Sequence, residues 1–311
     1  MAQVVLEASQ LKKAYNGTMA VDGLNLKIEE GEIFGFLGPN GAGKTTTILM
    51  LLGLTEPTSG EAFIYGHNCT REALKVKKVT GYLPENIGFY EDMTARENLK
   101  YVARLNGIHD PKAGTKIEEL LKLVGLSDVA DREVGKFSKG MRQRLGIANV
   151  LVKDPRLVIL DEPTTGIDPE GVSQILDLIE SMAREQGMAV LLCSHLLYQV
   201  QKICDRIGII VDGKLVVEGS IQQMGQKMAS ESTFSLEVRV NRLDVDLLES
   251  IKSIPGVIDI ERFGDTMTIK SEEDVTDRIS RAIVDAGSLP LMIRAQDYTL
   301  EEIYMKYFHG E

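Results

Sequence analysis

A glycine-rich loop, residues 38–45, fits the pattern G-x-x-x-x-G-K-[ST], which is typical of phosphate-binding sites. An apolar strand-like run, residues 32–37, precedes the loop, and a helix-like run, residues 46–52, follows it. Glycines let successive backbone N–H groups point at phosphate oxygens, and a helix that starts at Lys44 adds the positive end of its dipole. The pattern predicts a phosphate-binding loop in which Lys44 reaches the β and γ phosphates and Thr45 ligates Mg²⁺. The alternative for this motif alone is a glycine-rich turn without a ligand.

Two adjacent carboxylates, Asp161 and Glu162, follow the apolar run 157–160, which Pro155 and Pro163 bound. A continuous apolar run of this length is typical of a strand buried on both faces of a parallel sheet. Carboxylates directly after such a strand are costly to bury unless a cation or a reaction needs them. Asp161 therefore suits the coordination shell of Mg²⁺, and Glu162 suits a general base that polarises an attacking water.

Two further polar residues follow predicted strands. Glu85 comes after the run 78–84, and His195 comes after the run 188–193. Because α/β sheets place their ligands at the carboxyl ends of the strands, we expect both side chains near Asp161 and Glu162. For His195 a satisfied core side chain is the alternative, and a contact with the γ-phosphate is favoured.

Two residues have a functional and a structural interpretation. Ser138 precedes a helix that runs through residue 152, so its hydroxyl either helps to hold an anion at the helix N-terminus or simply caps the helix. Tyr15 stands 23 residues before Gly38 and either stacks on an adenine ring or is a half-buried tyrosine at the end of a strand.

The elements that must position these residues follow an α/β pattern through about residue 220. Strands are expected at residues 4–6 and 24–28, with turns at Asn16-Gly17 and Asp22-Gly23. Residues 86–152 are mostly helical in pattern and predict an inserted helical lobe, within which Thr94 and Glu97 fit a capping box. Asp168 is expected to cap a helix that begins at Pro169. Strands 206–211 and 215–218 predict a hairpin that closes this domain.

The remaining residues predict a second, smaller domain after a polar linker, residues 221–232. The expected order from residue 233 to residue 311 is strand, helix, strand, strand, helix, strand and a terminal helix. The order β-α-β-β-α-β is typical of a ferredoxin-like fold. Its expected elements are strands 234–240, 257–262, 266–270 and 291–295 and helices 245–251, 275–286 and 299–308.

Length and composition exclude several classes of protein. A chain of 311 residues is about right for two domains. A net charge of −11 provides no basic field for nucleic acid or an anionic membrane surface, so we expect no nucleic-acid partner. The 3 cysteines lack C-x-x-C spacing, which indicates a reducing compartment and no structural zinc. No secretory signal and no apolar run of about 18 residues is found, so we expect a cytoplasmic protein.

With these motifs in order, residues 3–220 resemble the ATPase subunit of ABC transporters. The resemblance implies a P-loop NTPase, with a RecA-like α/β core and a helical lobe in a domain of residues 1–220, that binds ATP and Mg²⁺. It identifies Glu162 and His195 as the catalytic glutamate and the switch histidine, and Thr45, Glu85 and Asp161 as the metal-binding residues. It implies a homodimer that sandwiches two ATP molecules and a separate membrane permease as partner, with the subunit on the inner face of the cell membrane. The implied ATP-binding residues are Tyr15, Gly38, Pro39, Asn40, Gly41, Ala42, Gly43, Lys44, Thr45, Thr46, Ser138 and Gly140.

Two departures from the family pattern point to one branch of it. The signature Ser-Gly-Gly-Gln reads Ser138-Lys139-Gly140-Met141, and the usual Q-loop glutamine is Glu85, whose carboxylate would bind Mg²⁺ more strongly but repel the γ-phosphate. Both resemble the exporter branch, the drug and sodium extrusion type. Within it, residues 81–86, 137–146 and 192–195 look most like the ATPase of the Nos transporter, which supports copper-site assembly in nitrous oxide reductase.

Other functions stay open at the level of the sequence. A general drug or ion exporter is the first alternative, and an ABC-type ATPase that acts as a switch without transport is the second. That second class typically carries two fused nucleotide domains or a long coiled coil, and this chain has one nucleotide site and no sustained heptads. The C-terminal domain is expected to support dimerisation, with a ligand sensor as the alternative.

Overall fold

The computed structural model describes residues 3–225, 234–295 and 300–309. The chain forms two compact units, of which the first comprises Met1–Ser220 together with Tyr307–Glu311 and the second comprises Ile221–Lys306. Of the expected linker, residues 221–225 are helical, and residues 226–232 lie outside the described part of the chain.

The first unit is built on a six-stranded sheet in which five strands are parallel and β10 is antiparallel to β9. All residues of β3, β7 and β8 are buried, which accounts for their uninterrupted apolar sequences. The strands in spatial order are β10 (Lys214–Gly219), β9 (Arg206–Val211), β3 (Ile33–Leu37), β8 (Ala189–Ser194), β7 (Leu157–Asp161) and β6 (Thr80–Leu83).

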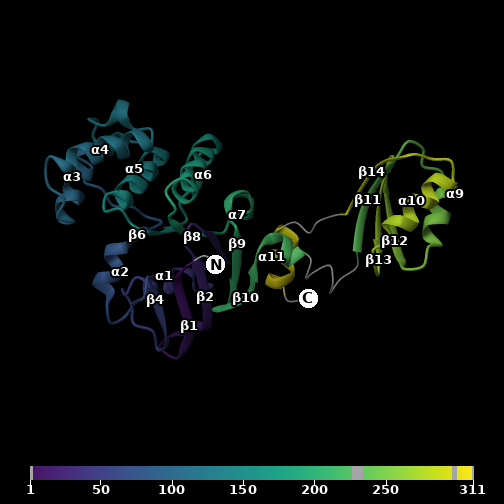
Figure 1. Cartoon of the computed structure of the whole chain (residues 1–311), viewed down its shortest axis with the longest axis horizontal. Coiled ribbons are helices and arrows are strands. Elements are labelled where there is room, and N and C mark those ends of the chain that lie inside the picture. The colour runs from purple at the N-terminus through teal and green to yellow at the C-terminus, as the bar shows by residue number, and fades with distance from the viewer. Residues whose placement is uncertain (1–2, 226–233, 296–299, 310–311) are drawn as a thin grey trace. The chain divides into compact units, whose positions relative to one another are not determined.

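Both faces of this sheet are covered. Figure 1 shows the helices α5 (Lys139–Leu151), α6 (Pro169–Arg184) and α7 (Leu197–Ile203) above it and α1 (Lys44–Leu51) below it. Because side chains alternate along a strand, Phe34 and Phe36 join the same core as helix α1, whereas the neighbouring Gly35 faces Val200 of α7. No Cβ fits at Gly35, since it would lie 2.4 Å from the Val200 side chain. The glycine therefore lets α7 pack directly on the sheet.

A second sheet packs against α1, and one of its strands continues through a position where the sequence predicted a turn. Its strands, in order, are β2 (Thr18–Glu29), β1 (Val4–Tyr15), β4 (Ser59–Ile64) and β5 (His67–Asn68). The turn at Asn16-Gly17 joins β1 to β2, but the turn expected at Asp22-Gly23 is wrong. Gly23 has φ of 71° inside β2, where the register with β1 shifts. A β-bulge needs the same left-handed glycine as a turn, so the two look alike in sequence.

The helical lobe contains α3 (Ala95–Leu105), α4 (Lys112–Leu123) and α5, with short 3₁₀ turns at Ser127–Val129 and Val134–Lys136. The expected capping box is confirmed, because the Thr94 hydroxyl accepts from the Glu97 N–H and the Glu97 carboxylate accepts from the Thr94 N–H.

The strand that the sequence predicted from residue 78 begins only at Thr80. Residues Ala73–Val79 form helix α2, in which Val76 is the buried residue.

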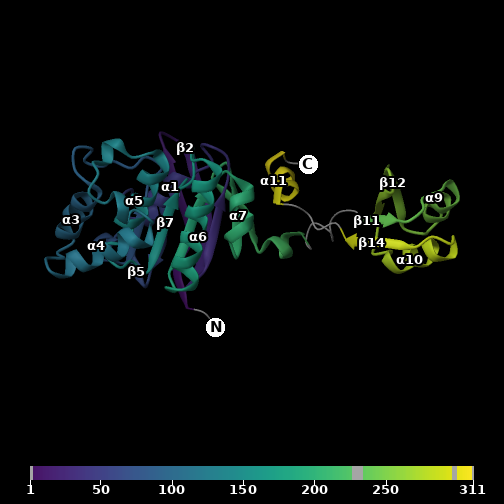
Figure 2. The same ribbon diagram turned by 90° about the horizontal axis from the view of Figure 1, so that it is seen from above.

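The second unit has the ferredoxin-like order predicted from the sequence. Its sheet is antiparallel, with the strand order β12-β13-β11-β14. Figure 2 shows helices α9 (Val245–Lys252) and α10 (Thr276–Asp285) beside this sheet, and their apolar residues share one core with it. The strands are β11 (Phe234–Val240), β12 (Val257–Phe263), β13 (Thr266–Ser271) and β14 (Pro290–Ala295), and the terminal helix is α11 (Leu300–His309). Within the described residues, no helix is long and apolar enough to cross a membrane.

Candidate nucleotide site

The glycine-rich loop connects β3 to α1 and wraps around its own lysine. Gly41 and Gly43 have φ of 84° and 106°, and a Cβ at Gly43 would lie 2.4 Å from the carbonyl oxygen of Ala20. Lys44 is buried, and its Nζ donates to the carbonyl oxygens of Gly38 at 2.6 Å and Pro39 at 3.1 Å. The loop therefore holds a buried cation beside backbone N–H groups at a helix N-terminus, an arrangement that suits a polyphosphate.

Thr45 and Asp161 meet at this loop although 116 residues separate them in the sequence. The Thr45 hydroxyl donates to Asp161 Oδ2 at 3.4 Å. Burial is the main cause that raises the pKa of Asp161, and the negative charges of Glu162 and Glu85 raise it further, against the opposing effect of Lys44. The structure thus gathers all of these carboxylates at one edge of the sheet, where the electrostatic field favours a cation.

Glu162 adopts an unusual backbone conformation directly after β7, with φ of 51°. Its Oε2 lies 2.9 Å from His195 Nδ1 and accepts a hydrogen bond from the Thr165 hydroxyl at 3.2 Å. Its Oε1 is buried and has no protein partner. Because a buried carboxylate oxygen without a partner is costly, Oε1 marks a place for a water or a substrate proton.

The residues present fit a magnesium ion that phosphate oxygens help to hold. A hydroxyl and carboxylates are the hard oxygen donors that Mg²⁺ prefers, and this ion commonly takes one or two protein ligands and completes its shell with phosphates and waters. Among the described residues, no group of three or more His, Cys, Asp or Glu side chains could hold a metal by itself. Thr45 and Asp161 supply two oxygens that lie 3.4 Å apart, and Glu85 lies near enough to raise the pKa of Asp161.

Tyr15 lies at the end of β1 with 45% of its surface exposed, so it has the position of the half-buried strand-end tyrosine and still leaves part of its ring accessible to a ligand. Lys13 Nζ lies 5.0 Å from the centre of its ring. Tyr15 pairs with Thr18 across the β1–β2 hairpin, and Ala20 of the same hairpin contacts the glycine-rich loop. The ring is therefore a partly exposed aromatic surface, with Lys13 beside it, on an element that contacts the loop.

Ser138 and Gly140 stand apart from the groups above. Ser138 caps α5, because its hydroxyl accepts from the Met141 N–H at 3.2 Å. A Cβ at Gly140 would touch Ile167, in the loop after β7. In the part of the chain that the structure describes, neither residue has a hydrogen bond to the phosphate loop. Among the described residues, the contact that the structure shows for the Ser138 hydroxyl is therefore the helix cap.

A residue of the loop after β7, Thr164, and a residue of helix α7, Gln199, were not identified from the sequence. Thr164 and Gln199 are both buried, and the Thr164 hydroxyl donates to Gln199 Oε1. Nothing local in the sequence predicts this pair, because 35 residues separate its members.

Asp168 caps helix α6 as predicted, since its carboxylate accepts from the Gly171 N–H at the start of α6.

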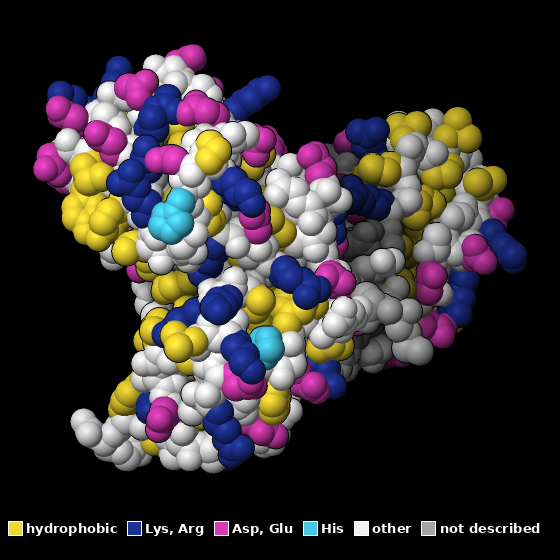
Figure 3. All heavy atoms as spheres, turned by 60° about the vertical axis from the view of Figure 1, so that its left-hand side comes forward, with side chains coloured by type: hydrophobic (Ala, Val, Ile, Leu, Met, Phe, Trp, Pro, Cys, Tyr) yellow, Lys and Arg dark blue, Asp and Glu magenta, His cyan; other side chains and the backbone are white. Residues whose placement is uncertain are grey.

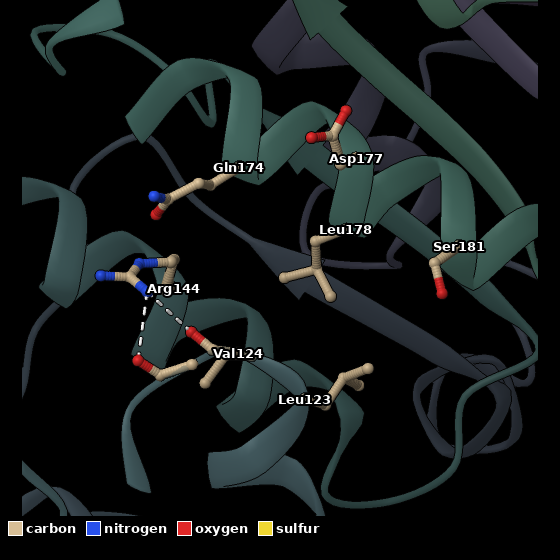
Figure 4. Close-up of a pocket in the computed structure, with 8 residues that line it drawn as sticks. Leu123, Val124, Arg144, Gln174, Asp177, Leu178 and Ser181 are labelled. Atoms are coloured by element: carbon tan, nitrogen blue, oxygen red, sulfur yellow. Dashed lines mark hydrogen bonds between the residues drawn. The ribbon is translucent and has the colours of Figure 1, made fainter. Parts of the chain in front are cut away.

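A cavity of about 480 Å³ lies between the helical lobe and α6 and contains none of the candidate site residues. Figure 4 shows the Arg144 side chain on one side of it, facing Gln174 and Leu178 of α6. The Arg144 guanidinium donates to the carbonyl oxygens of Val124 and Gly125, at 3.0 and 3.2 Å. It satisfies carbonyls at the end of α4, which is a structural role.

Comparison with known proteins agrees with this site. The family described as ABC transporter matches residues 21–165. The chain is 38% identical over 306 residues to the bacitracin transport ATP-binding protein BcrA of Bacillus licheniformis, and covers 98% of each chain. It is 33% identical over 306 residues to the linearmycin resistance ATP-binding protein LnrL of Bacillus subtilis (strain 168), and covers 97% of each. A solved structure described as the ATP binding subunit of an ABC transporter superposes with a TM-score of 0.66 at 28% identity, over 72% of this chain and 93% of that one.

The chain therefore belongs to the ABC transporter family, as its ATP-binding and ATP-hydrolysing subunit. The P-loop NTPase fold predicted from the glycine-rich loop is confirmed. The named relatives transport or confer resistance to antibiotics, and the resemblance to the Nos ATPase finds no support among them.

Proposed function

We propose that this chain powers the export of an antibiotic-type compound through a separate membrane permease. The observation that carries the proposal is the match over nearly the whole chain, C-terminal domain included, to relatives named for bacitracin transport and linearmycin resistance. Among the described residues no helix could span a membrane. The proposal assigns the transport path to the permease. In this proposal the subunit works on the cytoplasmic face of the membrane.

The residues of the site take the following roles in the proposal. Lys44 and the N–H groups of residues 38–46 bind the phosphates, and Thr45 and Asp161 hold Mg²⁺, with Glu85 beside them. The bound cation would neutralise charge on the phosphates. Glu162 Oε1, which is buried without a protein partner, accepts a proton from the attacking water. His195 keeps the Glu162 carboxylate in place through Oε2 and contacts the γ-phosphate.

A homodimer completes the site in this proposal. Ser138 and Gly140 have no hydrogen bond to the phosphate loop of their own chain, among the described residues, while the N–H groups at the start of α5 suit an anion. A second copy would bring its own Ser138 and Gly140 to the γ-phosphate that Lys44 holds. The exposed ring of Tyr15 would stack on the adenine.

The permease contact is proposed on the helical lobe. Tyr90, Tyr101 and Leu105 are exposed by 51%, 40% and 69%, although they are large apolar side chains. The rings of Tyr90 and Tyr101 pack edge to face with centroids 5.1 Å apart, and the helix after Thr94 carries Tyr101 and Leu105. Figure 3 shows hydrophobic side chains gathered on this lobe. With Phe89 beside them, they form an apolar surface that a partner protein would cover.

The first experiment is a pull-down of tagged Glu162→Gln protein with ATP from detergent-solubilised native membranes. A polytopic permease among the co-purifying chains supports the transporter, and recovery of soluble partners alone overturns it in favour of an ATPase switch. A copper-handling partner would favour the Nos-type function over antibiotic export.

The cargo is tested in cells that lack the gene. Complementation with the wild type, but not with Glu162→Gln, is expected to restore growth in at least one compound of a panel that includes bacitracin and linearmycin. Unchanged sensitivity across the panel, together with lost nitrous oxide reductase activity, would replace the antibiotic by the copper-related function.

A further inference from the structure

The segments that carry Glu162 and His195 are joined at a second, hidden point. Glu162 begins the loop after β7, and His195 begins the segment between β8 and α7. They meet through Glu162 Oε2 and His195 Nδ1 at 2.9 Å, a contact that solvent reaches because 44% of the His195 side chain is exposed. Beneath it, the Thr164 hydroxyl donates to Gln199 Oε1, and these residues are only 2% and 8% exposed.

We propose that Thr164 and Gln199 form a latch that positions His195 against Glu162 for ATP hydrolysis. Thr164 lies two residues after Glu162, and Gln199 lies four residues after His195 on the first turn of α7. The Glu162 N–H already donates to the Cys193 carbonyl oxygen at 2.9 Å, and the side-chain pair adds a second tie that extends from the loop after β7 to α7. The inference rests on the proposed roles of Glu162 and His195, and it assigns Thr164 and Gln199 as positioning residues that touch neither nucleotide nor water.

The loop after β7 needs such a support. Glu162 has φ of 51°, a strained conformation for a residue with a side chain, and such conformations persist only where the surroundings hold them. The Thr165 hydroxyl holds one oxygen of the Glu162 carboxylate at 3.2 Å, and the Ile167 N–H closes the loop on the Thr164 carbonyl at 3.3 Å. Gln199 is the residue outside the loop that fixes Thr164.

The buried Thr164–Gln199 hydrogen bond should hold the two segments together more firmly than the partly exposed Glu162–His195 contact. Water competes for the Glu162–His195 contact, whereas a hydroxyl and an amide oxygen that are both buried have no alternative partner when they separate. The latch therefore keeps the segments in register while Glu162 Oε1 stays open for the attacking water. Releasing it would displace the base by a fraction of an ångström or more, which is enough to slow a positioned proton transfer.

The test uses the purified full chain and removes the latch without changing its volume. Thr164→Val and Gln199→Leu each remove one partner of the hydrogen bond, while Thr164→Ser keeps the hydroxyl donor. We expect kcat to fall about ten- to hundredfold in the first two variants, with the KM for ATP changed less than twofold. Thr164→Ser should retain most of the activity.

The double variant Thr164→Val/Gln199→Leu should lose no more than either single variant, because both remove the same bond. Wild-type kcat in Gln199→Leu, or losses that multiply in the double variant, would overturn the latch. Variants whose thermal melting is unchanged give the decisive data.

Glu162→Gln separates a failure of the latch from a failure of the proposed roles. If Glu162→Gln hydrolyses ATP normally, the roles assigned to Glu162 and His195 are wrong. If Glu162→Gln is inactive while all latch variants match the wild type, only the latch is refuted.

Discussion

Thr45 and Asp161 are 116 residues apart in the chain, yet the Thr45 hydroxyl donates to Asp161 Oδ2 at 3.4 Å. The contact places the first residues of α1 against the end of β7, which are the two elements whose sequences pointed to a nucleotide site. It also explains why the carboxylate of Asp161 is buried beside like charges, since a cation between hydroxyl, carboxylate and phosphates would relieve that repulsion.

Asp161→Asn should stabilise the nucleotide-free protein near neutral pH while it abolishes hydrolysis. The folded-state pKa of Asp161 is raised by burial and by Glu162, so the fold favours the protonated carboxyl. That contribution is complete below the ordinary value of 3.8 and is lost as the pH rises through the raised pKa. We expect an increase in Tm of about 2–4 °C at pH 7, the shift that about 1 kcal/mol produces in a domain of this size.

Thermal melting of Asp161→Asn and wild type from pH 7 down toward the ordinary pKa of 3.8, without Mg²⁺ and nucleotide, checks this. The gap in Tm should narrow as the pH falls, because the wild-type carboxyl then takes up its proton. A gap that is constant with pH, or a variant that melts below the wild type at pH 7, would contradict it. Asp154→Asn, a change at an exposed carboxylate, is the matched control.

Glu162→Gln should bind ATP with unchanged affinity and lose hydrolysis about 100- to 10,000-fold, the range for removing a positioned general base. The amide keeps the shape of the side chain but accepts no proton from water. Size-exclusion chromatography should show a dimer with ATP and a monomer with ADP. Rapid turnover by this variant would show that Glu162 is not the base. A monomer at saturating ATP would show that the mechanism does not need the dimer.

Gly43→Ala should unfold the loop locally and cost more than a glycine replacement elsewhere. Gly43 has φ of 106°, and the new Cβ would lie 2.4 Å from the Ala20 carbonyl oxygen, so β2 would have to move. We expect a loss of about 2–4 kcal/mol in the free energy of unfolding, together with lost ATP binding.

Gly17→Ala is the matched control, because Gly17 has φ of 84° but no atom within 4 Å of a new Cβ. It should cost about 1 kcal/mol from backbone strain alone and leave ATP binding intact. Denaturant melts of both variants measure the difference. Equal losses would mean that strain, and not the contact with β2, controls the loop.

Tyr90→Ser/Tyr101→Ser should reduce co-purification with the permease and the turnover that the permease stimulates, while turnover of the isolated subunit is unchanged. The change removes two exposed rings that pack on each other on the helical lobe, away from the phosphate loop. Phe263→Ser, at a side chain 73% exposed in the second unit, serves as control. Normal co-purification and stimulated turnover in the double variant would show that the permease does not bind at Tyr90 and Tyr101.

Local pattern was enough to find the chemistry of this protein. The loop 38–45 is one continuous segment, and the carboxylates Asp161 and Glu162 are neighbours in another. Each follows an apolar run, which already indicates the carboxyl end of a buried strand. The strand and helix order of the second unit was readable for the same reason, because each element carries its own periodicity. The bulge at Gly23 and helix α2 were misread, since short segments satisfy more than one backbone pattern.

Only the tertiary structure decided which distant segments meet. The Thr164–Gln199 pair, the left-handed backbone of Glu162 and its unpartnered Oε1 result from how β7, β8 and α7 pack. Such contacts depend on burial and register between elements, which a single sequence does not encode in any local spacing.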